Sequence, residues 1–125
     1  MVQEIMKSNI VKLKKEDSLC KALDMMDTHN VNGAPVVDED GQLLGMIVKA
    51  DIYRFLMEEG HYDTCPVDWA MTKDVVVARS EEDIMTVAKR IRKNNIVAIP
   101  IINDKNMVKG TVSIENIMDY VIKKS

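Results

Sequence analysis

Residues 33–52 read GAPVVDEDGQLLGMIVKADI, and residues 97–117 read VAIPIINDKNMVKGTVSIENI. Both stretches have an apolar run around a proline, a polar turn, a second apolar run with a glycine, and then a polar residue before isoleucine. Pro35 matches Pro100 and Gly45 matches Gly110, so the offset is 65 residues both times (100 minus 35, 110 minus 45). Two tandem copies of one unit explain a register that needs no gap.

The same offset extends to both sides of these stretches, where it aligns Met6 with Met71 and Asn30 with Asn95. We therefore assign residues 1–62 to the first copy and 63–125 to the second, with a connector over 61–71. Because a chain of about 60 residues buries too little apolar surface to be stable by itself, we expect the copies to share one core.

Hydrophobic periodicity gives the same order of elements in each copy. The first copy predicts strand 9–13, a helix capped by Ser18, strands 33–37 and 42–48 around a turn at 38–41, and helix 51–57. The second copy predicts strand 74–78, a helix capped by Ser80, strands 97–102 and 107–112, and helix 114–122. The connector predicts a short helix that begins near Pro66. The fold class is therefore α+β, with two β-α-β-β-α units.

Composition excludes several functional classes. A net charge of −3 argues against nucleic acid as the main partner. No apolar run is long enough to span a bilayer, and the N-terminus lacks a signal-peptide pattern, so we expect a cytoplasmic protein. We also find no activated nucleophile, no metal-ligand spacing and no glycine-rich phosphate loop, so we predict no enzyme, no metal and no catalytic cofactor.

The duplicated pattern resembles the CBS domain family over the whole chain. The markers are the strand that ends in Pro-Val-Val-Asp, the acidic turn with glycine, and the transition from the second glycine to Asp-Ile at the last helix. The resemblance implies a CBS pair, or Bateman module, in which two motifs pack as one pseudo-twofold module. Such modules are regulatory, bind adenosine-containing ligands such as AMP, ADP, ATP or S-adenosylmethionine, and commonly form dimers through their helices.

The resemblance also implies two ligand clefts, each of which combines strands of one motif with the strand-to-helix junction of the other. The first set is Asp51, Val75, Val76, Ile96, Val97 and Ala98. The second set is Ser113, Asn116, Ile10, Val11, Val31, Asn32 and Gly33. A carboxylate at a helix start suits a ribose diol, because it accepts two O–H hydrogen bonds. The alternative is a structural role, in which the negative charge of Asp51 stabilises the N-terminal end of the helix through the helix dipole.

Both sets depart from the family pattern for phosphate binding. The first copy has Val48 and Ala50 where family members usually carry a hydroxyl. The second copy keeps Ser113 but has Asn116 in place of the carboxylate and Glu115 beside it, and Glu115 would repel a phosphate if it faced the cleft.

The prediction is therefore a regulatory module that binds an adenosine-type metabolite and signals to a protein partner in trans. The alternative is a ligand-free interaction module whose clefts are vestigial. We also expect a homodimer, because the last helices carry apolar stripes that a unit this small cannot bury internally. These stripes are Ile52, Phe55 and Leu56 in one copy and Ile117, Tyr120 and Val121 in the other.

Overall fold

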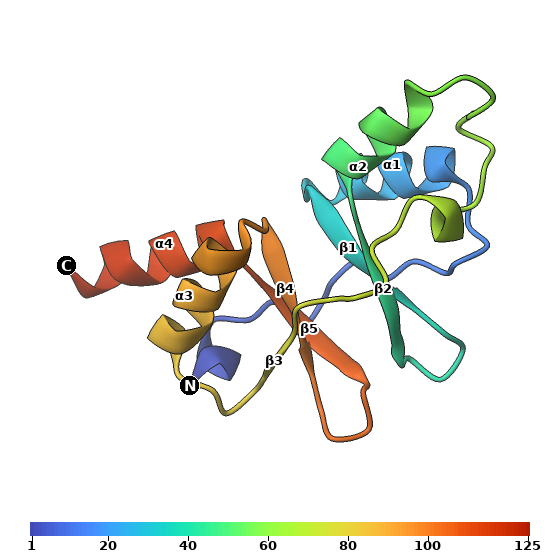
Figure 1. The fold of residues 1–125 in the computed structure, drawn as a ribbon. Coiled ribbons are helices and arrows are strands. Elements are labelled where there is room, and N and C mark those ends of the chain that lie inside the picture. The colour runs from blue at the N-terminus through green and yellow to red at the C-terminus, as the bar shows by residue number, and fades with distance from the viewer. The chain divides into compact units, whose positions relative to one another are not determined.

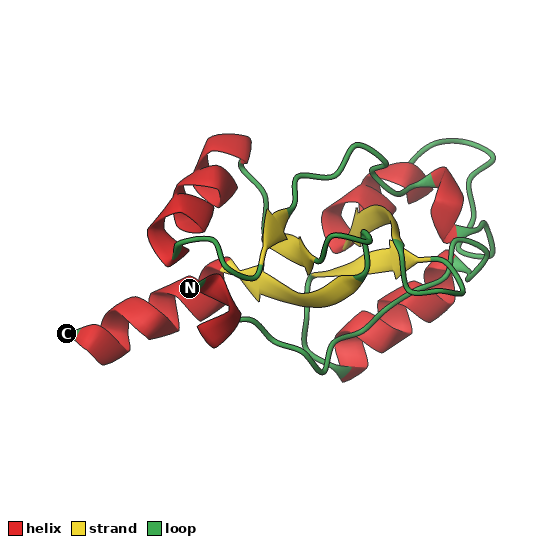
Figure 2. Cartoon of the chain, turned by 90° about the horizontal axis from the view of Figure 1, so that it is seen from below, coloured by secondary structure: helices red, strands yellow, loops and turns green.

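The computed structural model describes residues 1–125, which form two compact units. One unit is Val11–Val75, and the other combines Met1–Ile10 with Val76–Ser125. Figure 1 shows the chain coloured from the blue N-terminus to the red C-terminus. Each unit contains a small sheet of its own and α-helices, and Figure 2 shows the strands in yellow and the helices in red. The α+β class predicted from the sequence is confirmed.

The unit of residues 11–75 contains a hairpin and two α-helices. Helix α1 (Leu19–Thr28) precedes strands β1 (Gly33–Val37) and β2 (Leu43–Val48), which pair antiparallel, and α2 (Lys49–Leu56) follows β2 directly. The 3-10 helix η2 (Val67–Trp69) completes the unit. Instead of the predicted strand at 9–13, only Leu13 forms an isolated bridge, to Val36.

The other unit repeats this order. It contains the 3-10 helix η1 (Val2–Glu4), strand β3 (Ala78–Arg79), helix α3 (Ile84–Asn94), strands β4 (Ala98–Ile102) and β5 (Val108–Ser113), and helix α4 (Ile114–Lys124). Strand β4 pairs parallel with β3 and antiparallel with β5. The strand predicted at 74–78 is therefore reduced to Ala78–Arg79, which ends one residue later. Helix η1 was not predicted from the sequence. Its signal is the repeat itself, which aligns Val2 with Val67 of η2.

The repeat is visible in details of the hairpins. Both have a register shift at the same place, after Val36 in β1 and after Ile101 in β4. In the first turn Asp38 Oδ1 accepts from the amides of residues 40 and 42. In the second Asn103 Oδ1 accepts from the amides of residues 105 and 107. An Asx side chain that mimics a backbone turn thus sets both hairpins.

The caps of the first helix of each copy were predicted with unequal success. Ser18 caps α1, as expected, by accepting from the Lys21 amide. Ser80 does not cap α3: the N-cap is Asp83, whose Oδ2 accepts from the amides of Met85 and Thr86. The prediction of Ser80 was wrong because a carboxylate three residues later caps the helix instead. The offset of 65 residues aligns Asp83 with Ser18 (83 minus 18), so the repeat contained the correct signal.

Each unit takes its leading segment from the other copy of the repeat. Residues 1–10 pack with the second copy, where Lys7 and Thr111 exchange backbone hydrogen bonds of 2.9 and 3.0 Å. The segment before Val76 packs with the first copy, where Met46 and Thr72 exchange bonds of 2.9 and 2.8 Å. Val2 and Val67, at equivalent positions of these segments, are both fully buried.

Buried side chains form two clusters, one in each unit. Leu13, Leu19, Met26 and Ile47 are in one cluster, while Val87, Ile91, Ile99 and Ile101 are in the other. Each cluster contains residues of both copies of the repeat, because the exchanged segments bring Val67 into the first cluster and Val2 into the second. Neither copy therefore completes its core from its own residues, and one core common to both units stays a prediction.

Candidate functional site

The strand-to-helix junctions have the same backbone geometry in both units. The Lys49 amide at the start of α2 donates to the Asn32 carbonyl at 2.9 Å, and the Ile114 amide at the start of α4 donates to the Val97 carbonyl at 3.3 Å. Each helix start is therefore held against the residue that precedes the first strand of the hairpin. Asp51 and Asn116 follow two residues after these bonded helix starts.

The junction at α2 presents a carboxylate and uncapped amides. Val48 is the N-cap, and it makes no side-chain hydrogen bond to the first turn because it has no polar atom. Asp51 lies in that first turn, with its side chain 25% exposed, and accepts a hydrogen bond from Arg54. Lys49 forms an ion pair with Asp27. A ligand at this junction would meet one acceptor group, Asp51, and the positive end of a helix dipole.

The junction at α4 is closed by its own side chains. Ser113 Oγ accepts from the Asn116 amide at 3.1 Å, and Asn116 Oδ1 accepts from the Ser113 amide at 2.9 Å, which is a capping box. The Ser113 and Asn116 oxygens that the sequence offered to a ligand therefore each already accept one hydrogen bond at the helix start, while the Ser113 O–H donor is not used in the capping box. The Nδ2 group of Asn116 keeps its donors.

The other predicted site residues lie beside these junctions or at the boundary between the units. Val11 is buried in the first cluster, Val31 packs against it and Ile96 packs against the second. Ile10, Val75 and Val76 lie where the chain passes from one unit to the other. Each predicted set takes residues from both units, so the two clefts stay predictions.

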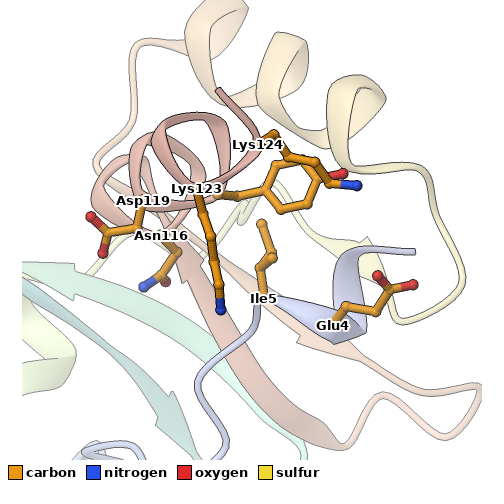
Figure 3. A pocket seen from close by; sticks show the side chains of 7 residues that line it. Glu4, Ile5, Asn116, Asp119, Lys123 and Lys124 are labelled. Atoms are coloured by element: carbon orange, nitrogen blue, oxygen red, sulfur yellow. The ribbon is translucent and has the colours of Figure 1, made fainter.

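A cavity that the sequence did not indicate lies between η1 and α4. Its volume is about 470 Å³, and it is lined by Glu4, Ile5, Asn116, Asp119, Tyr120, Lys123 and Lys124 (Figure 3). The α4 residues recur at helical spacing, but the facing wall comes from a segment more than 100 residues earlier in the chain (116 minus 5), which no local pattern connects to α4. A second cavity of about 350 Å³ adjoins the acidic turn of the first hairpin, at residues 38–40.

No three His, Cys, Asp or Glu side chains are grouped so that they could hold a metal ion. None of the helices has the length and apolar character needed to cross a membrane.

Comparison with known protein families shows that the same family model matches both halves of the chain. The family model described as "CBS domain" matches residues 2–58 and again residues 67–123. The chain belongs to the CBS domain family. The resemblance read from the duplicated pattern is thus confirmed. In this chain both motifs have an exchanged leading segment, a helix, a hairpin and a second helix, and the leading strand of the motif is formed only in the second unit, as β3.

Solved CBS pairs share this fold. The chain is similar to the CBS domain pair of protein MJ0100, solved in complex with 5′-methylthioadenosine and S-adenosyl-L-methionine, with a TM-score of 0.91, 29% identity and coverage of 100% of this chain and 98% of that one. It also matches the putative acetoin utilization protein AcuB from Vibrio cholerae, with a TM-score of 0.89, 19% identity and coverage of 98% and 90%, which shows the fold alone.

Curated relatives are much longer than the region that matches. A homoserine O-acetyltransferase from Methanococcus vannielii is 28% identical over 97% of this chain and 25% of its own length. The uncharacterized protein MJ1225 from Methanocaldococcus jannaschii is 31% identical over 86% of this chain and 38% of its own length. The chain therefore spans about a quarter to two fifths of these relatives, and in the transferase the CBS pair is a minor part of the protein.

Proposed function

We propose that this CBS pair is a regulatory module that binds an adenosine-containing metabolite, with the Asp51 carboxylate as the acceptor for the ribose hydroxyls. The observation that carries the proposal is the α2 junction, where a partly exposed carboxylate lies in the first turn of a helix whose N-cap residue has no polar side chain. The ligands of the MJ0100 pair, which is similar over the full length of this chain, support the adenosine class.

The two junctions favour unequal occupancy. At α4 the Ser113 and Asn116 oxygens each already accept a backbone amide in the capping box, so a ribose hydroxyl would have to share the Asn116 oxygen with the Ser113 amide. At α2 it would displace only the side chain of Arg54, which is 70% exposed and forms an i,i+3 pair worth less than about 1 kcal/mol. We therefore propose one high-affinity ligand per chain, at Asp51, and a vestigial second junction.

The absence of a hydroxyl at Val48 and Ala50 bears on which adenosine compound is bound. Family members that hold a phosphate usually place Ser or Thr there, and the Lys49 cation is paired with Asp27. A phosphate at this junction would lack the usual side-chain donors. We therefore propose that the ligand is a phosphate-free adenosine compound, such as S-adenosylmethionine or 5′-methylthioadenosine, in preference to AMP, ADP or ATP.

The regulatory output requires a second protein whose affinity depends on the ligand. We propose a partner in trans or a self-associated form, and the exposed face of α4 is the candidate surface for a homodimer. Ile52 and Ile117 of the apolar stripes predicted from the sequence are buried inside their own units. Met118, Val121 and Ile122 on α4 remain 56%, 49% and 66% exposed. Of the predicted α4 stripe, Val121 is exposed and Tyr120 is half-buried.

The test compares two variants that each remove one partner of the Asp51–Arg54 ion pair. Asp51→Ala removes the proposed ribose acceptor, whereas Arg54→Ala removes only its exposed partner. Thermal unfolding with S-adenosylmethionine at 100 times its dissociation constant should stabilise the parent chain by about 2.7 kcal/mol. Arg54→Ala should keep or exceed this stabilisation, and Asp51→Ala should lose it.

Equal stabilisation of both variants would remove Asp51 from the site. No stabilisation of the parent chain by S-adenosylmethionine, 5′-methylthioadenosine or AMP would reject the adenosine proposal and favour the ligand-free interaction module. A larger effect of AMP than of S-adenosylmethionine would reject only the preference for a phosphate-free ligand.

A further inference from the structure

The cavity between η1 and α4 lies wholly within one compact unit, and its lining combines apolar side chains with hydrogen-bond donors. Ile5 and Tyr120 pack against the buried cluster of this unit and form an apolar floor. Apart from Glu4 the polar lining comes from α4, where residues 116, 119 and 123 follow at intervals of three and four. The volume of about 470 Å³ lies in the range typical of small-molecule sites, roughly 300–1,000 Å³.

Hydrogen-bond donors on this face lack acceptors in the protein. Asn116 gives its oxygen to the Ser113 amide, so its Nδ2 group is left with two donors. Lys123 takes part in none of the ion pairs of the chain, and its side chain runs alongside Ile5 in Figure 3. Lys124 Nζ lies 5.4 Å from the centre of the Tyr120 ring, a cation–π contact.

The two acidic residues of the lining do not neutralise these donors directly. Glu4 is bonded to the N-terminal ammonium group at 2.9 Å. Asp119 points away from Ile5 (Figure 3) and forms no ion pair with either lysine. The centre of the cavity therefore offers an aromatic face together with N–H donors.

The first copy of the repeat provides an internal comparison. The offset of 65 residues aligns Lys123 with Glu58 and Tyr120 with Phe55 (123 minus 58, 120 minus 55). The charge is thus reversed in the first copy, where the Phe55 ring is already stacked on His61 with centroids 3.8 Å apart. An aromatic ring beside cationic donors occurs only at the second copy, where Lys124 lies over the Tyr120 ring, and this argues against a feature that the fold requires.

We propose that this cavity binds a small molecule with a flat ring and an anionic group. The ring lies against Tyr120 and Ile5, and the anion accepts hydrogen bonds from Lys123 Nζ and Asn116 Nδ2. The site shares Asn116 with the second predicted set, but it is separate from the proposed ribose site, since neither Asp51 nor the α2 junction contributes to it.

The test uses 2-naphthoate, a flat-ring carboxylate without adenosine, in a titration followed by ¹⁵N–¹H correlation spectra. Backbone amides of residues 5, 116 and 120 should shift together, and the fitted affinity should exceed that of 2-naphthylmethanol (ring alone) and of acetate (anion alone) at least tenfold. Lys123→Glu should weaken 2-naphthoate at least tenfold, and Tyr120→Leu, which keeps an apolar side chain, should weaken it several-fold.

Glu58→Gln, at the equivalent position of the first copy, is the matched control and should leave the affinity unchanged. Asp51→Ala should also leave it unchanged, which separates this site from the ribose site. Shifts that map elsewhere, equal binding of 2-naphthylmethanol, or unchanged affinity in Lys123→Glu would overturn the proposal.

Discussion

Gly45→Ala should release the segment that the second copy contributes to the first unit. A Cβ atom at Gly45 would lie 2.7 Å from the Thr72 carbonyl oxygen and 2.7 Å from Met71 Sδ. Both distances are shorter than van der Waals contact, and the carbonyl belongs to the backbone, so the segment has to move. The two hydrogen bonds between Met46 and Thr72, at 2.9 and 2.8 Å, are the interactions that this movement breaks.

The magnitude follows from these two bonds. Each contributes about 0.5–1.5 kcal/mol net, so their loss costs about 1–3 kcal/mol. Replacing glycine by alanine also restricts the unfolded chain, which offsets about 0.4–1 kcal/mol. The net loss is about 0–2.6 kcal/mol, and its central value of about 1.3 kcal/mol lowers the melting temperature by about 4–8 °C for a chain of this size.

Scanning calorimetry measures this shift, and hydrogen exchange at the Thr72 amide locates it. Met71→Ala in the Gly45→Ala background removes the contact with sulfur but leaves the contact with the carbonyl, so most of the loss should persist. Gly60→Ala is a useful contrast, because no atom lies within 4 Å of its Cβ and only its positive φ of +83° opposes the change. A Gly45→Ala protein that melts within 1 °C of the parent, with the Thr72 amide still protected, would refute the reasoning.

Two further predictions concern a surface ion pair and the exposed helix face. The Arg90 hydrogen bonds lower the pKa of Glu82, so this pair stabilises the fold above the ordinary pKa of Glu82, and the contribution is lost as the pH falls through the lowered value. Glu82→Gln should therefore lower the melting temperature at neutral pH and converge with the parent in strong acid; a constant difference across the pH range would contradict this. Ile122→Glu on α4 should turn a dimer into a monomer by light scattering without lowering the melting temperature of the monomer, because this side chain is 66% exposed. A parent chain that is already monomeric at micromolar concentration would rule out the homodimer.

Local patterns in the sequence were enough to predict most of the helices and strands. Helix α1 begins after Ser18 as predicted, because a cap and an apolar face at helical spacing are set by neighbouring residues. Both hairpins appear near their predicted positions, because Asp38 and Asn103 set the turns through bonds to residues two and four positions ahead. The CBS family could be recognised from the same duplicated pattern.

Only the tertiary structure decided which segment completes which core. Val2 and Val67 are buried in the unit built from the other copy, and their partners lie far away in the sequence, so no local periodicity indicates them. The same holds for the cavity at Tyr120, whose second wall is Ile5. At the α4 junction the sequence offered Ser113 and Asn116 to a ligand, and the structure shows them bonded to each other. Residue types state what a site could bind, but hydrogen bonds within the fold decide which of those atoms are still available.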